Sequence, residues 1–145
     1  MSTATQLRSY TYDASQVLKA TGAVTASAAS GTTPINVGVG FYTGVAVIDV
    51  TAITVGADNA YDLVVQGSDS PTFASGIENL AAINLGNVAV RDGGAATSLV
   101  GRYELPFTNE QNGQNYSYVR IFTRVAGTTP SINYTALVGL DRLPR

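Results

Sequence analysis

The sequence predicts an all-β protein, a single-domain antiparallel jelly roll or β-sandwich of about eight strands with an N-terminal arm. Apolar and polar residues alternate with period two along most of the chain, which indicates strands with one buried face. Turn-forming Gly, Asn, Asp and Pro residues separate these segments at short intervals. Helix is almost excluded, because only residues 73–80 could form a turn or so.

The expected strands cover most of the chain after residue 15. They are residues 16–28, 35–38, 45–55, 61–67, 79–90, 101–107 and, as two strands joined by one loop, 116–142. The segment 45–55 is rich in β-branched residues, as central strands are. Pro106 cannot donate a ladder hydrogen bond, so its strand is expected at a sheet edge or to end there. Residues 1–13 are expected to form the arm and residues 14–145 the jelly-roll domain.

Composition limits the classes of function. Charged residues make up 12% of the 145 residues, about half the usual share, so the surface suits coverage by other protein. The net charge of −2 and the scattered arginines give no sign of nucleic-acid binding. The chain has no His and no Cys, which removes the usual general base, the commonest metal ligand and thiol chemistry. The sequence predicts neither a transmembrane helix nor a signal peptide.

Two polar groupings are candidates for chemical sites. Asp58, Asn59 and Asp62 could offer oxygen ligands to calcium, but the pattern lacks a third acid and a distal Glu, so turn chemistry is favoured. Paired carboxylates can hydrolyse glycosides, although no pair can be placed from the sequence. The acids nearest aromatic residues are Glu104, Glu110 and Asp141. We therefore expect no enzyme, no cofactor and no metal.

The strand that begins near residue 116 has two unlike faces. Val119, Ile121 and Val125 lie on one face and are expected in the core. The other face carries Tyr116, Tyr118, Arg120, Phe122 and Arg124. Tyr and Arg are enriched in protein–protein hot spots, so we interpret this face as a protein-contact surface. Three alternatives are that this face is itself the core, that the strand is two-sided and buries Phe122 while exposing only the arginine tips, or that the aromatic rings stack on sugars.

The N-terminal arm is a second candidate contact. Its larger side chains are Leu7, Arg8, Tyr10 and Tyr12. Such an arm could become ordered on a neighbouring protein and add a strand or a clasp to it.

Short phrases of the sequence, in their order, resemble the Bbp16-like capsid cement (decoration) proteins of tailed bacteriophages. These are DASQVLKATGAVTASAASGTTPINVG at 13–38, LVVQGSDSPTFASGIENLAAINLG at 63–86 and GRYELPF at 101–107. A Tyr-x-Tyr-Val-Arg strand, a Val-Ala-Gly-Thr-x-Pro-Ser loop and a final strand ending in Leu-Asp-Arg follow. The similarity covers roughly residues 13–142 and includes no catalytic signature.

The resemblance implies a jelly roll on the outer surface of a virion that is assembled in the host cytoplasm. Its expected partners are the major capsid protein, whose capsomers it would bridge, and itself as a dimer or trimer. Neither nucleic acid nor membrane is an expected partner. The resemblance transfers no individual site residue. The alternative is a carbohydrate- or receptor-binding jelly-roll module of a virion, against which the absence of Trp counts.

Overall fold

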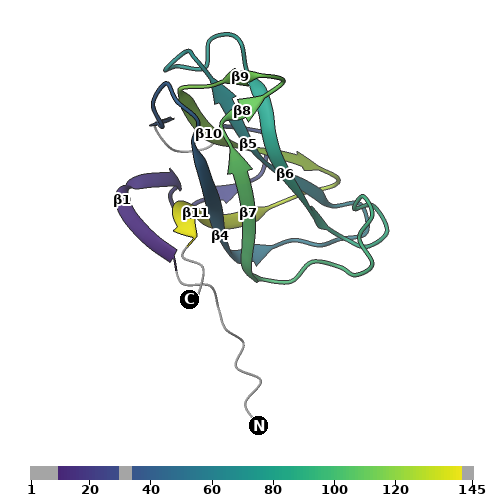
Figure 1. The fold of residues 1–145 in the computed structure, drawn as a ribbon. Coiled ribbons are helices and arrows are strands. Elements are labelled where there is room, and N and C mark those ends of the chain that lie inside the picture. Colours follow the sequence, from purple (N-terminus) through teal and green to yellow (C-terminus); the bar gives the residue numbers. More distant parts are fainter. Residues whose placement is uncertain (1–9, 30–33, 142–145) are drawn as a thin grey trace.

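The computed structural model describes residues 10–29 and 34–141, which form antiparallel β-sheets and no helix (Figure 1). One sheet has the order β1 (Tyr10–Lys19), β11 (Ile132–Asp141), β4 (Thr43–Ile53) and β7 (Gly101–Thr108), and β2 (Ala23–Val24) also pairs with β11. The second sheet has the order β3 (Ile35–Asn36), β10 (Tyr118–Ala126), β5 (Ala60–Ser68) and β6 (Glu78–Gly86). A small hairpin consists of β8 (Glu110–Gln111) and β9 (Gln114–Asn115).

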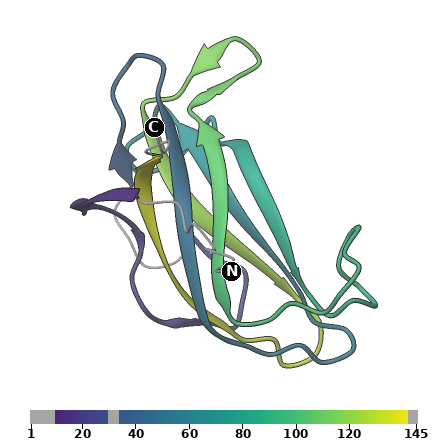
Figure 2. The same ribbon diagram turned by 60° about the horizontal axis from the view of Figure 1, so that its bottom comes forward.

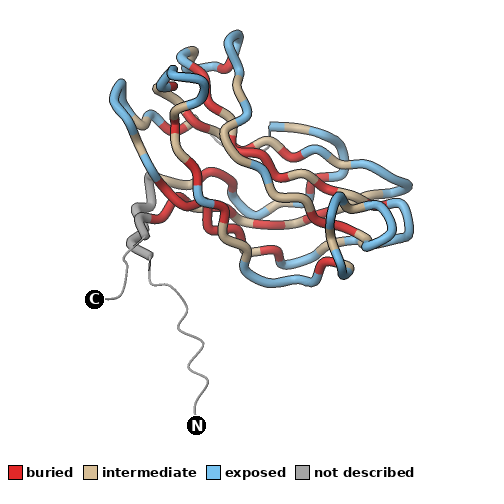
Figure 3. The backbone as a smooth tube through the Cα atoms, turned by 45° about the vertical axis from the view of Figure 1, so that its right-hand side comes forward, coloured by how far each residue is buried: buried red, intermediate tan, exposed pale blue. Residues whose placement is uncertain are grey.

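The two larger sheets pack face to face around one main core, and their long strands are seen lengthwise in Figure 2. Alternation places every second side chain between the sheets. In β5, Tyr61, Leu63 and Val65 are fully buried, and in β11 the same holds for Ile132 and Tyr134. Buried and less buried residues therefore alternate along the tube in Figure 3. Each buried aliphatic side chain contributes about 1.5–3 kcal/mol to folding.

Most of the expected long strands are present, within a few residues of their expected bounds. Pro106 lies in β7 at the edge of its sheet, as its missing N–H requires. Residues 73–80, the one stretch where the sequence allows a helical turn, form a loop and the start of β6 instead. Within the described ranges the chain forms eleven strands instead of about eight, because short strands and a hairpin were not anticipated.

The prediction of one continuous strand over residues 16–28 is wrong, because β1 ends at Lys19 and β2 covers only Ala23–Val24. The chain turns at residues 20–22 between β1 and β2, and Ala28 then forms a bridge with Thr123 in the other sheet. This stretch therefore crosses from one sheet to the other. Strand β1 begins at Tyr10 and pairs with β11, so residues 10–13 of the expected arm belong to the first sheet. Residues 1–9 lie outside the described part of the chain.

The turn after β1 is organised by Lys19, the single lysine of the chain. Its side chain is 2% exposed, which is rare for lysine. The Nζ atom donates hydrogen bonds to the carbonyl oxygens of Ala20 (2.9 Å), Gly22 (2.7 Å) and Tyr134 (2.9 Å). It also lies 4.6 Å from the centroid of the Tyr134 ring, a cation–π contact. Desolvation by burial lowers the pKa of Lys19 from its ordinary value.

Two buried asparagines hold the loops at opposite ends of the sandwich. The β4–β7 ladder runs from Thr43 paired with Thr108 to Val50 paired with Gly101. Beyond the first pair, the Asn109 side chain accepts from the N–H of residue 42 (2.8 Å) and donates to the carbonyls of residues 40 (2.8 Å) and 116 (2.9 Å).

At the other end of the sandwich, the Asn59 side chain likewise bonds the backbone of two loops. Its side chain accepts from the Gly56 N–H at 2.8 Å and donates to the Thr128 carbonyl at 3.0 Å. Asn59 therefore joins the loop between β4 and β5 to the loop between β10 and β11. Both asparagines are almost completely buried, and their side chains satisfy backbone groups that the strands leave unpaired.

Candidate protein-contact surface

The two faces of β10 differ as the sequence predicts. Val119 and Ile121 are buried in the core, so the alternative in which the aromatic face is the core is wrong. Tyr118, Arg120 and Phe122 are half-buried on the outer side, and residue 124 is exposed. Period-two alternation along a strand is sufficient to produce this division.

Tyr116 does not belong to the outer face, which corrects its assignment to the contact set. Strand β10 begins only at Tyr118, so the alternation cannot be extended back through the turn that precedes it. Tyr116 is 9% exposed, and its N–H donates to the Asn109 carbonyl at 2.8 Å. A Cβ added to Gly67 would lie only 2.9 Å from the Tyr116 Cβ, so the two residues pack tightly together.

Cross-strand polar rows hold the two arginines of the outer face in place. Arg124 is paired in register with Asp62, which is paired with Asn84 on β6. The Arg124 Nε lies 2.8 Å from Asp62 Oδ2, and the Asn84 amide donates to Asp62 Oδ1 at 2.6 Å. The Arg124 side chain is nevertheless 64% exposed, so the end of its guanidinium remains open to a partner.

A second row runs parallel to the first. The Arg120 Nε donates to Gln66 Oε1 at 3.0 Å, and the Gln66 amide donates to Asn79 Oδ1 at 3.0 Å. Between the two rows, Phe122 lies opposite Val64 in the ladder. The surface therefore alternates hydrogen-bonded polar rows with an apolar row, and each of its two arginines donates a cross-strand hydrogen bond.

Phe73 completes this surface and was not anticipated as part of it. The ring comes from the loop between β5 and β6 and is 5% exposed, and the Arg120 Cζ lies 4.4 Å from its centroid. The backbone of Phe73 has a φ of 54°, which non-Gly residues adopt rarely. Burial lowers the pKa of Arg120. The sequence signal was the Phe-Ala-Ser turn, but it did not show that the loop folds onto the sheet.

Hydrogen bonds to loop backbone and to Thr128 account for Asp58 and Asn59, the first two residues of the calcium alternative. Asp58 Oδ2 accepts from the N–H (2.9 Å) and hydroxyl (2.7 Å) of Thr128, and these hydrogen bonds lower the pKa of Asp58. Asn59 bonds the backbone as described above, whereas Asp62 lies in the polar row with Arg124. Among the described residues no three His, Cys, Asp or Glu side chains are grouped as metal ligands.

The structure tests the arm residues only in part. Leu7 and Arg8 lie outside the described residues. The backbone of Tyr10 and Tyr12 is paired with β11 at Asp141 and Gly139, but their side chains are not among those described. These four residues therefore remain sequence predictions.

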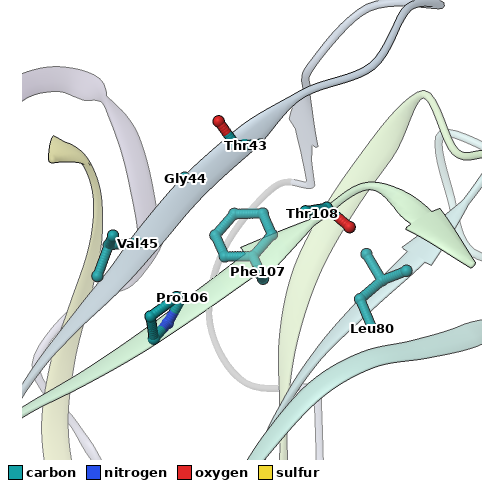
Figure 4. A pocket seen from close by; sticks show the side chains of 7 residues that line it. All are labelled: Thr43, Gly44, Val45, Leu80, Pro106, Phe107 and Thr108. Carbon is teal, nitrogen blue, oxygen red and sulfur yellow. The ribbon is translucent and has the colours of Figure 1, made fainter.

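A separate open hollow of about 570 Å³ lies around β7 (Figure 4). Its described lining contains no ionisable side chain and consists of Thr43, Gly44, Val45, Leu80, Pro106, Phe107 and Thr108. Large apolar side chains are also exposed in the loops. The most exposed are Val39 (90%), Leu99 (74%), Phe41 (64%) and Val100 (59%). The sequence alone did not mark any of these four residues as exposed, although Val39 and Phe41 alternate with glycines.

Neither a protein-family model nor a curated protein matches the chain. In the part of the chain that the structure describes, no helix is long and apolar enough to cross a membrane.

Proposed function

We propose that the chain is a structural capsid decoration protein that binds the outer surface of a phage head and stabilises the contacts between capsomers of the major capsid protein. The chain would act there as a dimer or trimer. The observation that carries the proposal is the strand order. It fits a jelly roll, and a jelly roll is the fold that the resemblance to the cement proteins implies.

The pairing of the strands supports the jelly-roll assignment. Without β2 and the β8–β9 hairpin, eight strands remain in the order β1, β3, β4, β5, β6, β7, β10 and β11. In this order the outermost strands pair with each other and the pairing continues inward: β1 pairs with β11, β3 with β10, β4 with β7 and β5 with β6. This is a long antiparallel ribbon. When such a ribbon wraps into two sheets, strands from its two halves also pair, and here β11 pairs with β4 and β10 with β5. This is the pairing expected of a jelly roll.

The outer face of β10, β5 and β6 is the proposed contact surface for the shell. Its arginines are held by neighbouring side chains, so little conformational entropy is lost when a partner covers them. Exposed Arg124, flanked by half-buried Phe122, has the composition of a binding hot spot. Such modest contacts become effective when one particle presents many equivalent sites.

The sugar-binding alternative lacks a comparable observation. Among the aromatic residues whose side chains the structure describes, only Phe41 is exposed, and it lies in a loop and not in a row along a strand. Phe73 is covered, and Tyr118 and Phe122 are half-buried. We therefore retain the shell protein as the proposed partner.

The test is co-sedimentation of the purified chain with expanded capsids that lack it. Saturable binding at a fixed ratio to the shell protein is expected. Arg124→Ala should weaken this binding about 5- to 30-fold, as hot-spot arginines do, and should change stability by no more than about 1 kcal/mol. Failure of the wild-type chain to bind such capsids would refute the proposed function.

The opposite sheet offers a matched control for Arg124→Ala. Arg102 on β7 lies opposite Asp49 on β4, with Nε 3.0 Å from Asp49 Oδ1 and a side chain that is 40% exposed. Arg102→Ala removes a similar cross-strand ion pair from the other face. It should leave capsid binding unchanged, and equal losses for both variants would contradict the choice of face.

A further inference from the structure

Arg120 differs from the other two strand arginines whose side chains are described, because it has no carboxylate partner. The Nε atoms of Arg102 and Arg124 lie 2.8–3.0 Å from aspartate oxygens. The Arg120 Nε instead donates to the neutral Gln66 side chain at 3.0 Å. Within the described part of the chain, Arg120 forms no ion pair. Its guanidinium therefore carries a positive charge without an adjacent negative one.

The acids on the elements beside Arg120 are all engaged elsewhere. Asp62 on β5 pairs with an arginine of the other polar row. Asp69, in the loop after β5, accepts from a backbone N–H (3.1 Å) and a glutamine amide (3.3 Å), and Glu78 accepts from the next backbone N–H at 3.1 Å. Asp13 and Asp141 belong to β1 and β11 in the opposite sheet. No Asp or Glu occurs outside the described ranges, so the undescribed segments hold no missing counter-charge.

The surroundings of Arg120 orient its guanidinium and leave one end of it accessible. The Cζ atom lies 4.4 Å from the Phe73 ring centroid and 6.0 Å from that of Phe122. In the described residues, the one buried side-chain nitrogen or oxygen without a hydrogen-bond partner is the Nε of Arg91. The two Nη atoms of Arg120 have no such partner either, so they lie at the surface.

The chemistry of this end selects one class of ligand. With Nε already bonded, the two Nη groups present parallel N–H donors, and this fork matches both oxygens of a carboxylate. A phosphate polymer requires several unpaired cations along its path. Here the neighbouring Arg124 is already paired with Asp62, and the whole chain has a net charge of −2. A single unpaired charge on a protein-contact surface therefore suits a single carboxylate.

We propose that Arg120 is the receptor for one Asp or Glu side chain of the shell subunit, bound end-on through both Nη groups. This inference rests on the proposed function, because it names the shell subunit as the source of the carboxylate. The carboxylate would supply the negative charge that the chain itself does not place beside Arg120. Such a pair also fixes the register of two surfaces, because its geometry is specific.

The first arm of the experiment is a binding titration of wild type and Arg120→Met on capsids that lack the chain. Met keeps an unbranched stem next to Phe73 but has no charge. The Kd should rise about 10- to 100-fold, as the loss of a bidentate charge-assisted pair implies. The variant should unfold within about 4 °C of wild type, because it loses one hydrogen bond and an unpaired charge. Arg102→Met, on the opposite sheet, is the control and should leave the Kd unchanged.

The second arm identifies the ligand from the shell side and uses the wild-type chain as well. Each exposed Asp or Glu of the shell protein is replaced in turn by Asn or Gln. One shell variant should weaken wild type about 10- to 100-fold and Arg120→Met less than about 3-fold, because both changes remove the same pair. If every shell variant affects the two chains equally, the ligand is not a carboxylate and the inference is overturned.

The outcomes separate this inference from the proposed function. If wild type binds capsids and Arg120→Met binds equally well, the carboxylate receptor is refuted and the decoration role stands. If wild type does not bind capsids, the decoration role fails, and the assignment of the carboxylate to the shell fails with it.

Discussion

Lys19 offers a direct test of how this sandwich is held together. Lys19→Met keeps an unbranched apolar stem but removes the ammonium group. The carbonyl oxygens of Ala20, Gly22 and Tyr134 then lose donors at 2.7–2.9 Å. The buried Tyr134 carbonyl should cost about 1–3 kcal/mol when unsatisfied. The two turn carbonyls are only partly buried, so water can reach them and each should cost about 0.5–1 kcal/mol.

Part of this loss of stability is offset, because the variant no longer buries a charge. Desolvation lowers the pKa of Lys19, which shows that its charged form is penalised in the folded state. We therefore expect a net loss of about 2–3 kcal/mol in the free energy of unfolding. In a chain of this size the loss corresponds to a fall in Tm of about 6–9 °C, measurable by scanning calorimetry at pH 7.

The opposite result is physically possible and would refute the reasoning. Replacing a buried charge by an apolar side chain of similar volume is sometimes neutral or stabilising. A Tm within about 2 °C of wild type, or above it, would mean that desolvation outweighs the three hydrogen bonds. Amine acylation gives an independent check, because Lys19 carries the only side-chain amine. It should react in urea and stay protected in the native chain.

Three further predictions concern stability at alkaline pH, the Asn109 side chain that bonds two loops, and a glycine. Burial raises the pKa of Tyr134 to about 12, so only the unfolded state ionises this phenol between pH 10 and 12. The free energy of unfolding should then fall by about 3 kcal/mol across that window, and denaturant titrations should show a shallower fall in Tyr134→Phe. Asn109→Ala leaves the backbone groups of residues 40, 42 and 116 without partners and should lower the free energy of unfolding by about 3–4 kcal/mol. An unchanged urea midpoint would contradict this role of Asn109. Gly127 has a φ of 106° and no room for a Cβ beside the Asp58 carbonyl, so Gly127→Ala should cost about 2–4 kcal/mol. Gly40→Ala, with open space around its Cβ position, is the control and should be nearly neutral.

The sequence predicted the direction of side chains along the long strands because alternation is a local property of extended backbone. Val119 and Ile121 face the core, and Arg120 and Arg124 face outward, as their spacing requires. The same rule failed for Tyr116, because it holds only inside a strand and β10 starts two residues later. The break after Lys19 was missed because Thr, Ala and Val continue the apolar–polar pattern through the turn.

The candidate surface was predicted on one strand but completed by others. Asp62, Gln66 and Asn84 hold the arginines, and Phe73 supports one of them from a loop. These contacts depend on which strands lie side by side, and periodicity carries no information about strand neighbours. The exposed loop pair Val39 and Phe41 was likewise unrecognised, since an apolar residue in a loop can be buried or exposed.

The sequence by itself therefore determined the all-β class and the buried face of each long strand. Only the tertiary structure decided the order of the strands and the partners and burial of the polar side chains. Lys19 shows the physical reason most clearly, because one of its acceptors, the Tyr134 carbonyl, is 115 residues away along the chain. A lysine is normally solvated, and nothing in its neighbouring residues indicates that folding brings an acceptor and an aromatic ring to its ammonium group.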